Sequence, residues 1–105
     1  MSALSQARQR REVVQTFVES LAWFIGQCSF GGRYATKGVS VDKAYHSVLS
    51  SFNEMRAHIT RDVALCDEIA KKLERAYQAF KQGDEATGRM ICDALWQLPE
   101  LKKIR

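Results

Sequence analysis

The sequence has few residues of the kinds that mark unusual chains: one proline, six glycines and three cysteines among 105 residues. This scarcity excludes collagen-like, proline-rich and linker-dominated proteins. Hydrophobic residues make up 46% and charged residues 27%, which is typical of a globular chain rather than a disordered one. Because domains commonly contain about 100–150 residues, we expect residues 1–105 to form one domain, without a separate cofactor domain.

The three cysteines are too few, and odd in number, for the disulfide framework of a small secreted protein. Cys28, Cys66 and Cys92 lie far apart among apolar neighbours, and no two of them form a CxxC pair. The sequence therefore supports neither a zinc knuckle nor a thioredoxin-type redox site. We expect reduced, mostly buried thiols in a cytosolic protein.

Long hydrophobic runs are also missing. The longest apolar stretch covers residues 21–25, whereas a helix that crosses a bilayer needs about 20 apolar residues. The first eight residues are polar and lack the apolar segment of a signal peptide. We therefore expect a protein without membrane contact and with a cytoplasmic location.

Almost the whole hydrophobic pattern has the period of an α-helix, and no alternating strand pattern of useful length is present. Apolar residues recur every three or four positions from Val41 to Ile59 and from Val63 to Phe80, and again around Met90 and Ile91. We predict an all-α fold, a compact antiparallel helical bundle of three long helices plus one shorter C-terminal helix. The expected helices cover approximately residues 5–27, 41–58, 62–81 and 84–97.

Several residues at the predicted boundaries have the chemistry of helix caps. Short polar side chains can accept a hydrogen bond from an unpaired backbone N–H at a helix start, and those expected to do so are Ser40, Thr60 or Asp62, and Asp84. Gly83 can adopt the left-handed conformation that closes a helix. Pro99 lacks an N–H and is expected to stop the last helix.

Residues 29–39 form an unusual connection between the first two predicted helices. Connections in bundles usually take about 2–8 residues, so this Gly-rich loop is long. It contains half of the glycines, together with Phe30, Arg33, Tyr34 and Lys37 and no acidic residue. Its amides and cations can hold an anion, and its rings can stack on bases. A flexible connector with its aromatic rings tucked into the bundle end is the alternative.

Basic residues also cluster near both ends of the chain. Arg8, Arg10 and Arg11 precede the apolar part of the first helix, and Lys102, Lys103 and Arg105 are C-terminal. Half of the net charge of +4 nevertheless lies within residues 28–40, so no predicted helix is strongly positive. Either cluster can be a solvated helix end or a contact to a phosphate backbone.

Motifs that carry catalysis or bind a cofactor are absent from the sequence. The spacings GxxxxGK[ST], GxGxxG and HExxH do not occur. Glu54, His58 and Asp62 would share a face on one continuous helix, but the turn expected near residue 60 would move Asp62 away. Apolar surroundings raise the pKa of a cysteine thiol and so oppose nucleophilic catalysis. We predict a protein that is not an enzyme and that binds neither cofactor nor metal.

Two hypotheses from different classes follow. In the first, the protein is a small non-enzymatic interaction protein that docks on a larger protein or complex and is a candidate for self-association as a homodimer. Residues 17–25 are apolar nearly all round, which is typical of a central helix or of a subunit interface. The candidate interface residues are Phe17, Trp23 and Phe24.

In the second hypothesis, the protein is a nucleic-acid-binding accessory or regulatory protein, of the kind that phages and plasmids carry or that forms a small subunit of a nucleoprotein complex. It would use the basic loop and the N-terminal arm. The candidate contact residues are Arg8, Arg10, Arg11, Phe30, Arg33, Tyr34 and Lys37.

Overall fold

The computed structural model describes residues 3–59 and 62–104, and every regular element in these residues is a helix. The elements are α1 (Ala3–Cys28), the short 3-10 helix η1 (Phe30–Gly32), α2 (Val41–His58), α3 (Val63–Lys81), α4 (Glu85–Trp96) and α5 (Pro99–Ile104). The predicted all-α bundle is therefore confirmed. The bounds of its four longer helices lie close to the predicted ones.

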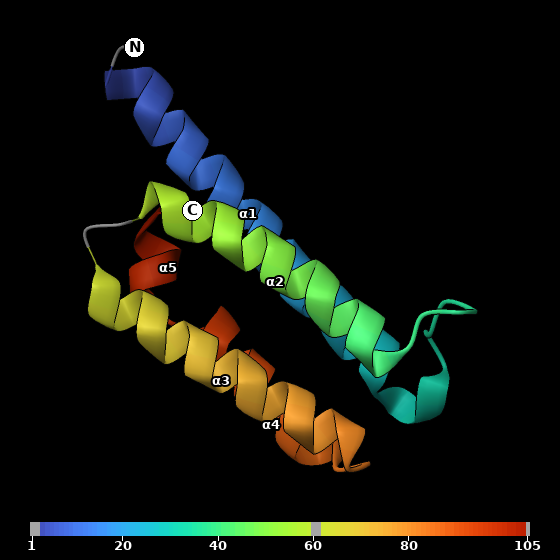
Figure 1. Cartoon of the computed structure of the whole chain (residues 1–105). Coiled ribbons are helices and arrows are strands. Elements are labelled where there is room, and N and C mark those ends of the chain that lie inside the picture. The colour runs from blue at the N-terminus through green and yellow to red at the C-terminus, as the bar shows by residue number, and fades with distance from the viewer. Residues whose placement is uncertain (1–2, 60–61, 105) are drawn as a thin grey trace.

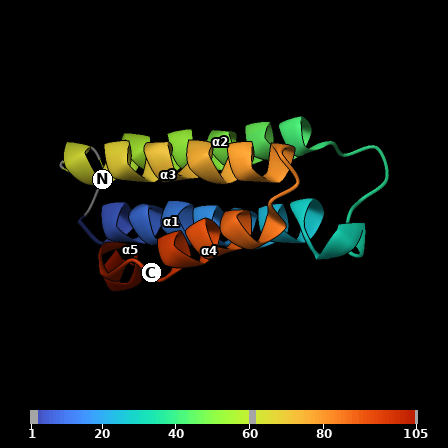
Figure 2. The same cartoon turned by 90° about the horizontal axis from the view of Figure 1, so that it is seen from below.

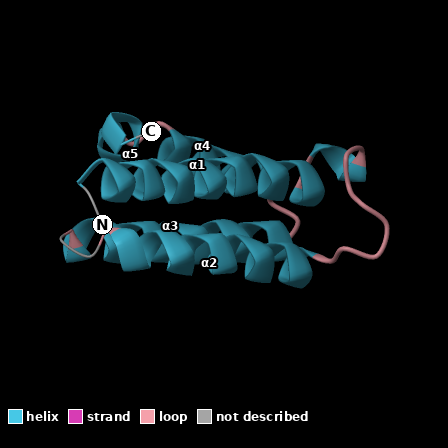
Figure 3. Cartoon of the chain, turned by 90° about the horizontal axis from the view of Figure 1, so that it is seen from above, coloured by secondary structure: helices cyan, strands magenta, loops and turns pink. Residues whose placement is uncertain are grey.

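Successive long helices run antiparallel (Figure 1). The chain reverses after α1 through the loop of residues 29–40 and reverses again after α2 and after α3. Seen from below, across the helix axes, α2 and α3 form one layer, and α1 with α4 and α5 forms the other (Figure 2). The molecule is elongated, with extents of 45 × 26 × 18 Å, and the loop of residues 29–40 projects from one end (Figure 3).

The helix starts have the predicted caps. Ser40 Oγ, Asp62 Oδ1 and Asp84 Oδ1 accept hydrogen bonds from backbone N–H groups three residues later, at 3.1, 3.0 and 3.3 Å. Gly83 has φ +81°, the left-handed conformation expected after α3. The other predicted cap of the third helix, Thr60, lies outside the described residues.

Pro99 begins a helix instead of only stopping one. The helix before it ends at Trp96, and α5 starts at Pro99 itself. A proline suits the first position of a helix because its missing N–H is not needed there and its φ is already helical. The helix α5 was not predicted from the sequence, and it places Leu101 fully inside the core.

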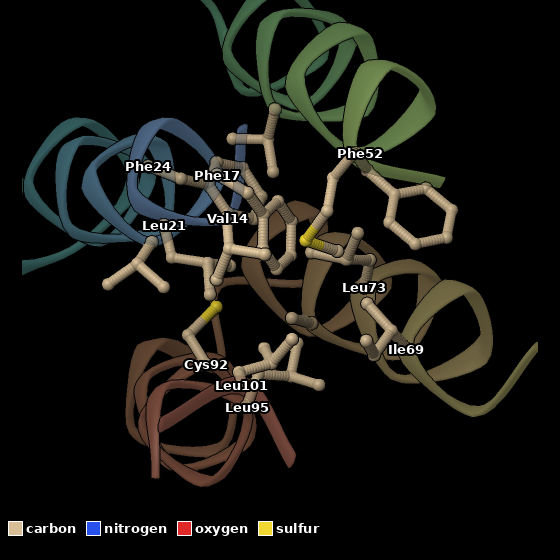
Figure 4. Packing of buried hydrophobic residues seen from close by; sticks show 14 of the residues in the cluster. Val14, Phe17, Leu21, Phe24, Phe52, Ile69, Leu73, Cys92, Leu95 and Leu101 are labelled. Atoms are coloured by element: carbon tan, nitrogen blue, oxygen red, sulfur yellow. The ribbon is translucent and has the colours of Figure 1, made fainter. Parts of the chain in front are cut away.

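One continuous hydrophobic core joins all five α-helices (Figure 4). The helix α1 packs against α2, α4 and α5, which explains why its residues 17–25 are apolar nearly all round. The large side chains that are fully buried come from every α-helix; they are Val14, Phe17, Val18, Leu21, Phe24, Val48, Phe52, Met55, Ile69, Leu73, Leu95 and Leu101.

Two residues that the periodic pattern places inward face solvent instead. The Val63 side chain is 61% exposed, because it occupies the first turn of α3, ahead of the residues that reach the core. Met90 is 66% exposed, and the neighbouring Ile91 packs against the core in its place. The inward prediction for Val63 was therefore wrong, whereas the prediction that Met90 or Ile91 faces inward holds for Ile91.

Candidate functional site

The Gly-rich loop has a defined path, with several hydrogen bonds to the helices. The side chain of Gln27, in the last turn of α1, donates to the Tyr34 carbonyl at 3.2 Å and accepts from the Thr36 N–H at 2.6 Å. On the other side, the Gly31 N–H donates to Glu85 Oε2 of α4 at 3.3 Å. These contacts attach the loop to both α1 and α4.

The two aromatic rings of the loop lie next to each other and are open to solvent. The Phe30 side chain is 48% exposed and that of Tyr34 is 59% exposed. Their ring centroids are 5.6 Å apart with an interplanar angle of 85°, an edge-to-face geometry that aromatic pairs favour. The rings therefore do not tuck into the bundle end, as the connector interpretation required.

An arginine accompanies each ring. The guanidinium carbon of Arg89, from α4, lies 5.1 Å from the Phe30 centroid, and that of Arg33 lies 5.8 Å from the Tyr34 centroid. Both distances are within the range of cation–π attraction. We call the four residues Phe30, Arg33, Tyr34 and Arg89 the aromatic–arginine surface. Arg89 could not be assigned to this surface from the sequence, because only the folded chain brings α4 against the loop.

The backbone of Phe30 is strained. Its φ of +59° is the one positive value among the described non-glycine residues. A bulky side chain in this left-handed region costs of order 1–3 kcal/mol, and surrounding contacts must hold it there. The loop thus keeps an exposed ring at a position where glycine would be the less strained residue.

Of the three candidate interface residues on α1, Trp23 is exposed, whereas Phe17 and Phe24 are not. Trp23 is 38% exposed and lies one turn before Gly26, where an added Cβ would meet the Tyr34 Cβ at 3.8 Å. Phe17 and Phe24 are fully buried and pack against aromatic rings of α2 and α3. Their prediction as interface residues was wrong, because the protein's own core occupies them.

The structure does not bring the basic N-terminal residues to the loop. Arg8, Arg10 and Arg11 lie in the first turns of α1, at the opposite end of the bundle from the aromatic–arginine surface (Figure 2). Lys37 is exposed on the loop itself, three residues beyond Tyr34. The seven predicted nucleic-acid contacts therefore do not form one continuous site.

Arg10 and Arg11 instead meet the C-terminal basic cluster. Together with Ala7 of α1 and Lys103 of α5, they line a pocket of about 300 Å³, and none of the described residues that line it is acidic. We call this the basic pocket. A second pocket, of about 340 Å³, lies beside it and includes both Arg8 and Glu12.

A larger pocket of about 510 Å³, which was not predicted from the sequence, lies between α3 and α4. Its charged lining residues are balanced, with Lys71 and Arg75 against Glu74 and Asp84. Asp84 already caps α4 through the N–H of Thr87. The lining therefore selects no particular charge in a ligand.

All three cysteines carry free, buried thiols, as the sequence predicted. Burial raises the pKa of Cys28 to about 11 and that of Cys92 to about 12, and the neighbouring Cys28 thiol adds to the second effect. Burial also raises the pKa of Cys66. At neutral pH these thiols are therefore protonated, which makes them poor nucleophiles.

No group of three or more His, Cys, Asp and Glu side chains is arranged to hold a metal ion within residues 3–59 and 62–104. In the same residues, no helix combines the length and the apolar character that crossing a membrane requires.

No protein-family model matches the chain, and comparison with curated proteins and with solved structures found no match either.

Proposed function

We propose that this protein is a small, non-enzymatic interaction protein that docks on a larger protein through the aromatic–arginine surface. The observation that carries the proposal is the pair of exposed rings, Phe30 and Tyr34, held edge to face with an arginine beside each. Tyrosine and arginine are among the residues that contribute most to protein–protein binding.

The backbone at Phe30 adds a second line of support. A strained residue in an exposed loop is retained only where other contacts hold it, and such strain is concentrated at binding and catalytic sites. The hydrogen bonds of Gln27 and the contact from Arg89 restrict the loop before any partner arrives. A surface ordered in advance loses less conformational entropy on binding.

A protein partner fits this surface better than a nucleic acid does. Glu85 accepts from the Gly31 N–H and lies 3.9 Å from Arg89, so a carboxylate stands among the cations. That charge opposes phosphate binding, whereas protein interfaces commonly combine aromatic rings, arginines and carboxylates. Nucleic-acid binding at this surface is the alternative outcome of the experiment below.

The cysteines support two further parts of the proposal, a cytoplasmic location and a role without thiol catalysis. Three buried free thiols are typical of a reducing compartment, which supports a cytoplasmic location. The raised pKa values of Cys28 and Cys92 support a role without thiol catalysis. Self-association is a weaker part of the proposal, because only Trp23 of its three candidate residues is exposed.

Affinity purification from the native host tests the proposal with three baits: the unaltered protein, Phe30→Ala/Tyr34→Ala and the control Val63→Ala. Each bait is used with and without nuclease. Both rings are exposed, so their removal leaves the core intact, and Val63→Ala trims an exposed apolar side chain outside the surface. Circular dichroism verifies the fold of each bait.

We expect a partner that survives nuclease and is retained by the unaltered protein and by Val63→Ala, but is lost with Phe30→Ala/Tyr34→Ala. Equal capture by all three baits would refute docking at this surface. Loss of the partner on nuclease treatment would favour the nucleic-acid alternative. Light scattering of the unaltered protein at several concentrations tests self-association, and a strict monomer would exclude it.

A further inference from the structure

We propose that the basic pocket at the other end of the bundle is a phosphate-binding site, separate from the aromatic–arginine surface. Two basic clusters that are more than 90 residues apart in the sequence form it together. Arg10 and Arg11 come from α1 and Lys103 from α5, and the first turns of α1 and α5 lie at the same end of the molecule (Figures 2 and 3).

Three positively charged side chains line this pocket. Among the described residues, each of Arg56, Lys72, Lys81 and Arg89 lies within 4 Å of a carboxylate. No ion pair of this kind involves the three cations of the basic pocket in residues 3–59 and 62–104. The three positively charged side chains repel one another, so an anion bound between them would reduce this electrostatic repulsion.

The side chains favour phosphate among anions. An arginine guanidinium presents a planar fork of N–H donors that matches the oxygens of a phosphate, and a lysine ammonium adds a compact charge. Two guanidinium groups and one ammonium group line the pocket, and Ala7 is the only other lining residue within residues 3–59 and 62–104. Its volume of about 300 Å³ lies at the lower end for ligand sites, which suits one or a few phosphate groups.

The pocket is also open to an approaching ligand. The first turns of α1 extend beyond the last turn of α2, so α2 does not cover them (Figure 1). Arg10, Arg11 and Lys103 are all exposed. A free polyphosphate and the backbone of a nucleic acid both present the required group, and the experiment separates these two sources.

An NMR titration of the ¹⁵N-labelled full chain at constant ionic strength tests the site with two probes. One probe is inorganic tripolyphosphate, and the other is a short oligodeoxythymidylate without terminal phosphates. The variants are Arg10→Gln/Arg11→Gln and Lys103→Gln. The matched control, Lys71→Gln/Arg75→Gln, removes the same charge as the first variant from α3, outside the basic pocket.

We expect shifts confined to the first turns of α1 and to α5. Arg10→Gln/Arg11→Gln should weaken binding by about tenfold or more, because two charge-assisted contacts are lost, and Lys103→Gln should weaken it severalfold. The control should bind as the unaltered chain does. Binding of tripolyphosphate alone assigns the site to small phosphorylated ligands, whereas pocket-dependent binding of the oligonucleotide assigns it to a nucleic-acid backbone.

Three results would overturn the proposal: no shift with either probe, equal weakening by the control, or unchanged affinity in Lys103→Gln. The Phe30→Ala/Tyr34→Ala variant should bind both probes normally, since its substitutions lie at the opposite end of the bundle. Failure of the aromatic–arginine surface as a docking site would therefore leave this test unaffected.

Discussion

Gly88→Ala should destabilise this protein, although the same change in most helix interiors is stabilising. Gly88 is buried in α4, where α4 packs against Phe80 of α3. A Cβ at this position would lie 2.4, 2.6 and 2.6 Å from three ring atoms of Phe80. Non-bonded carbon atoms prefer about 3.5–4.0 Å, so the ring or the helix would have to move.

The magnitude depends on whether the Phe80 ring can move aside. That ring is 5% exposed and packs edge to face on Phe24, which is fully buried, at a centroid distance of 5.2 Å. Replacing glycine by alanine favours the helix by about 1 kcal/mol. Overpacking a core costs about 1–3 kcal/mol, and a ring blocked by a second buried ring belongs at the upper end of that range. We expect a net loss of about 1–2 kcal/mol.

Thermal and urea denaturation followed by circular dichroism measures this loss, with a fall in Tm of roughly 4–8 °C for each kcal/mol. The control Ala94→Gly, at an exposed position of α4, measures the difference in helix propensity between alanine and glycine without a change in packing. It should lower the unfolding free energy by about 1 kcal/mol. Phe80→Leu should couple favourably with Gly88→Ala in a double-mutant cycle, because the smaller side chain makes room. A Gly88→Ala protein that is more stable than the unaltered chain would refute the reasoning.

Three further predictions concern single residues. Cys28 and Cys92 should react with a thiol reagent at neutral pH only as fast as the chain unfolds, because burial raises their pKa values to about 11 and about 12. Rapid reaction of the folded protein in native buffer would contradict this prediction. Hydrogen bonds from Thr87 lower the pKa of Asp84, so its charge stabilises the fold above the unfolded value of about 3.9. We therefore expect the unaltered chain to have a higher unfolding free energy than Asp84→Asn at neutral pH, and this difference should be lost as the pH falls through the lowered pKa of Asp84. A difference that grows in acid would contradict the prediction. Phe30→Gly should leave the unfolding free energy within about 1 kcal/mol of its original value, because relief of the left-handed strain offsets the greater entropy of the unfolded chain. A loss of several kcal/mol in denaturant titration would show that the ring is part of the core.

The sequence predicted those parts of the fold that depend on neighbouring residues. Hydrophobic spacing located the four longer helices because a helix must bury one face, and that requirement repeats every three or four residues. The caps at Ser40 and Asp84 were predictable because each cap bond spans only three residues. The short α5 was missed because six residues contain too little periodicity, and its anchor Leu101 shows its role only in the assembled core.

The candidate sites were predictable only in part, for the same physical reason. Phe30, Arg33 and Tyr34 were found because the composition of their loop differs from that of the helices. Arg89 and Lys103 were not placed, because their partners lie 59 or more residues earlier in the chain and only packing brings them together. An apolar strip also cannot distinguish a core side chain from an interface side chain, since both are hydrophobic. Only the burial of Phe17 and Phe24 separated them from Trp23.

The net charge of +4 is therefore better understood as two local arrangements than as a property of the whole surface. The rigid helix α1 keeps them apart: from Arg10 to Cys28, at its last residue, a rise of 1.5 Å per residue gives about 27 Å. The Debye length at physiological salt is about 8 Å, so charges at one end have little effect on a ligand at the other. A small ligand cannot reach both ends, and substitutions at the two sites should act additively on binding. Any coupling between them would have to pass through the packing of α1, where Gly88→Ala and its effect on the Phe24–Phe80 contact provide a way to perturb it.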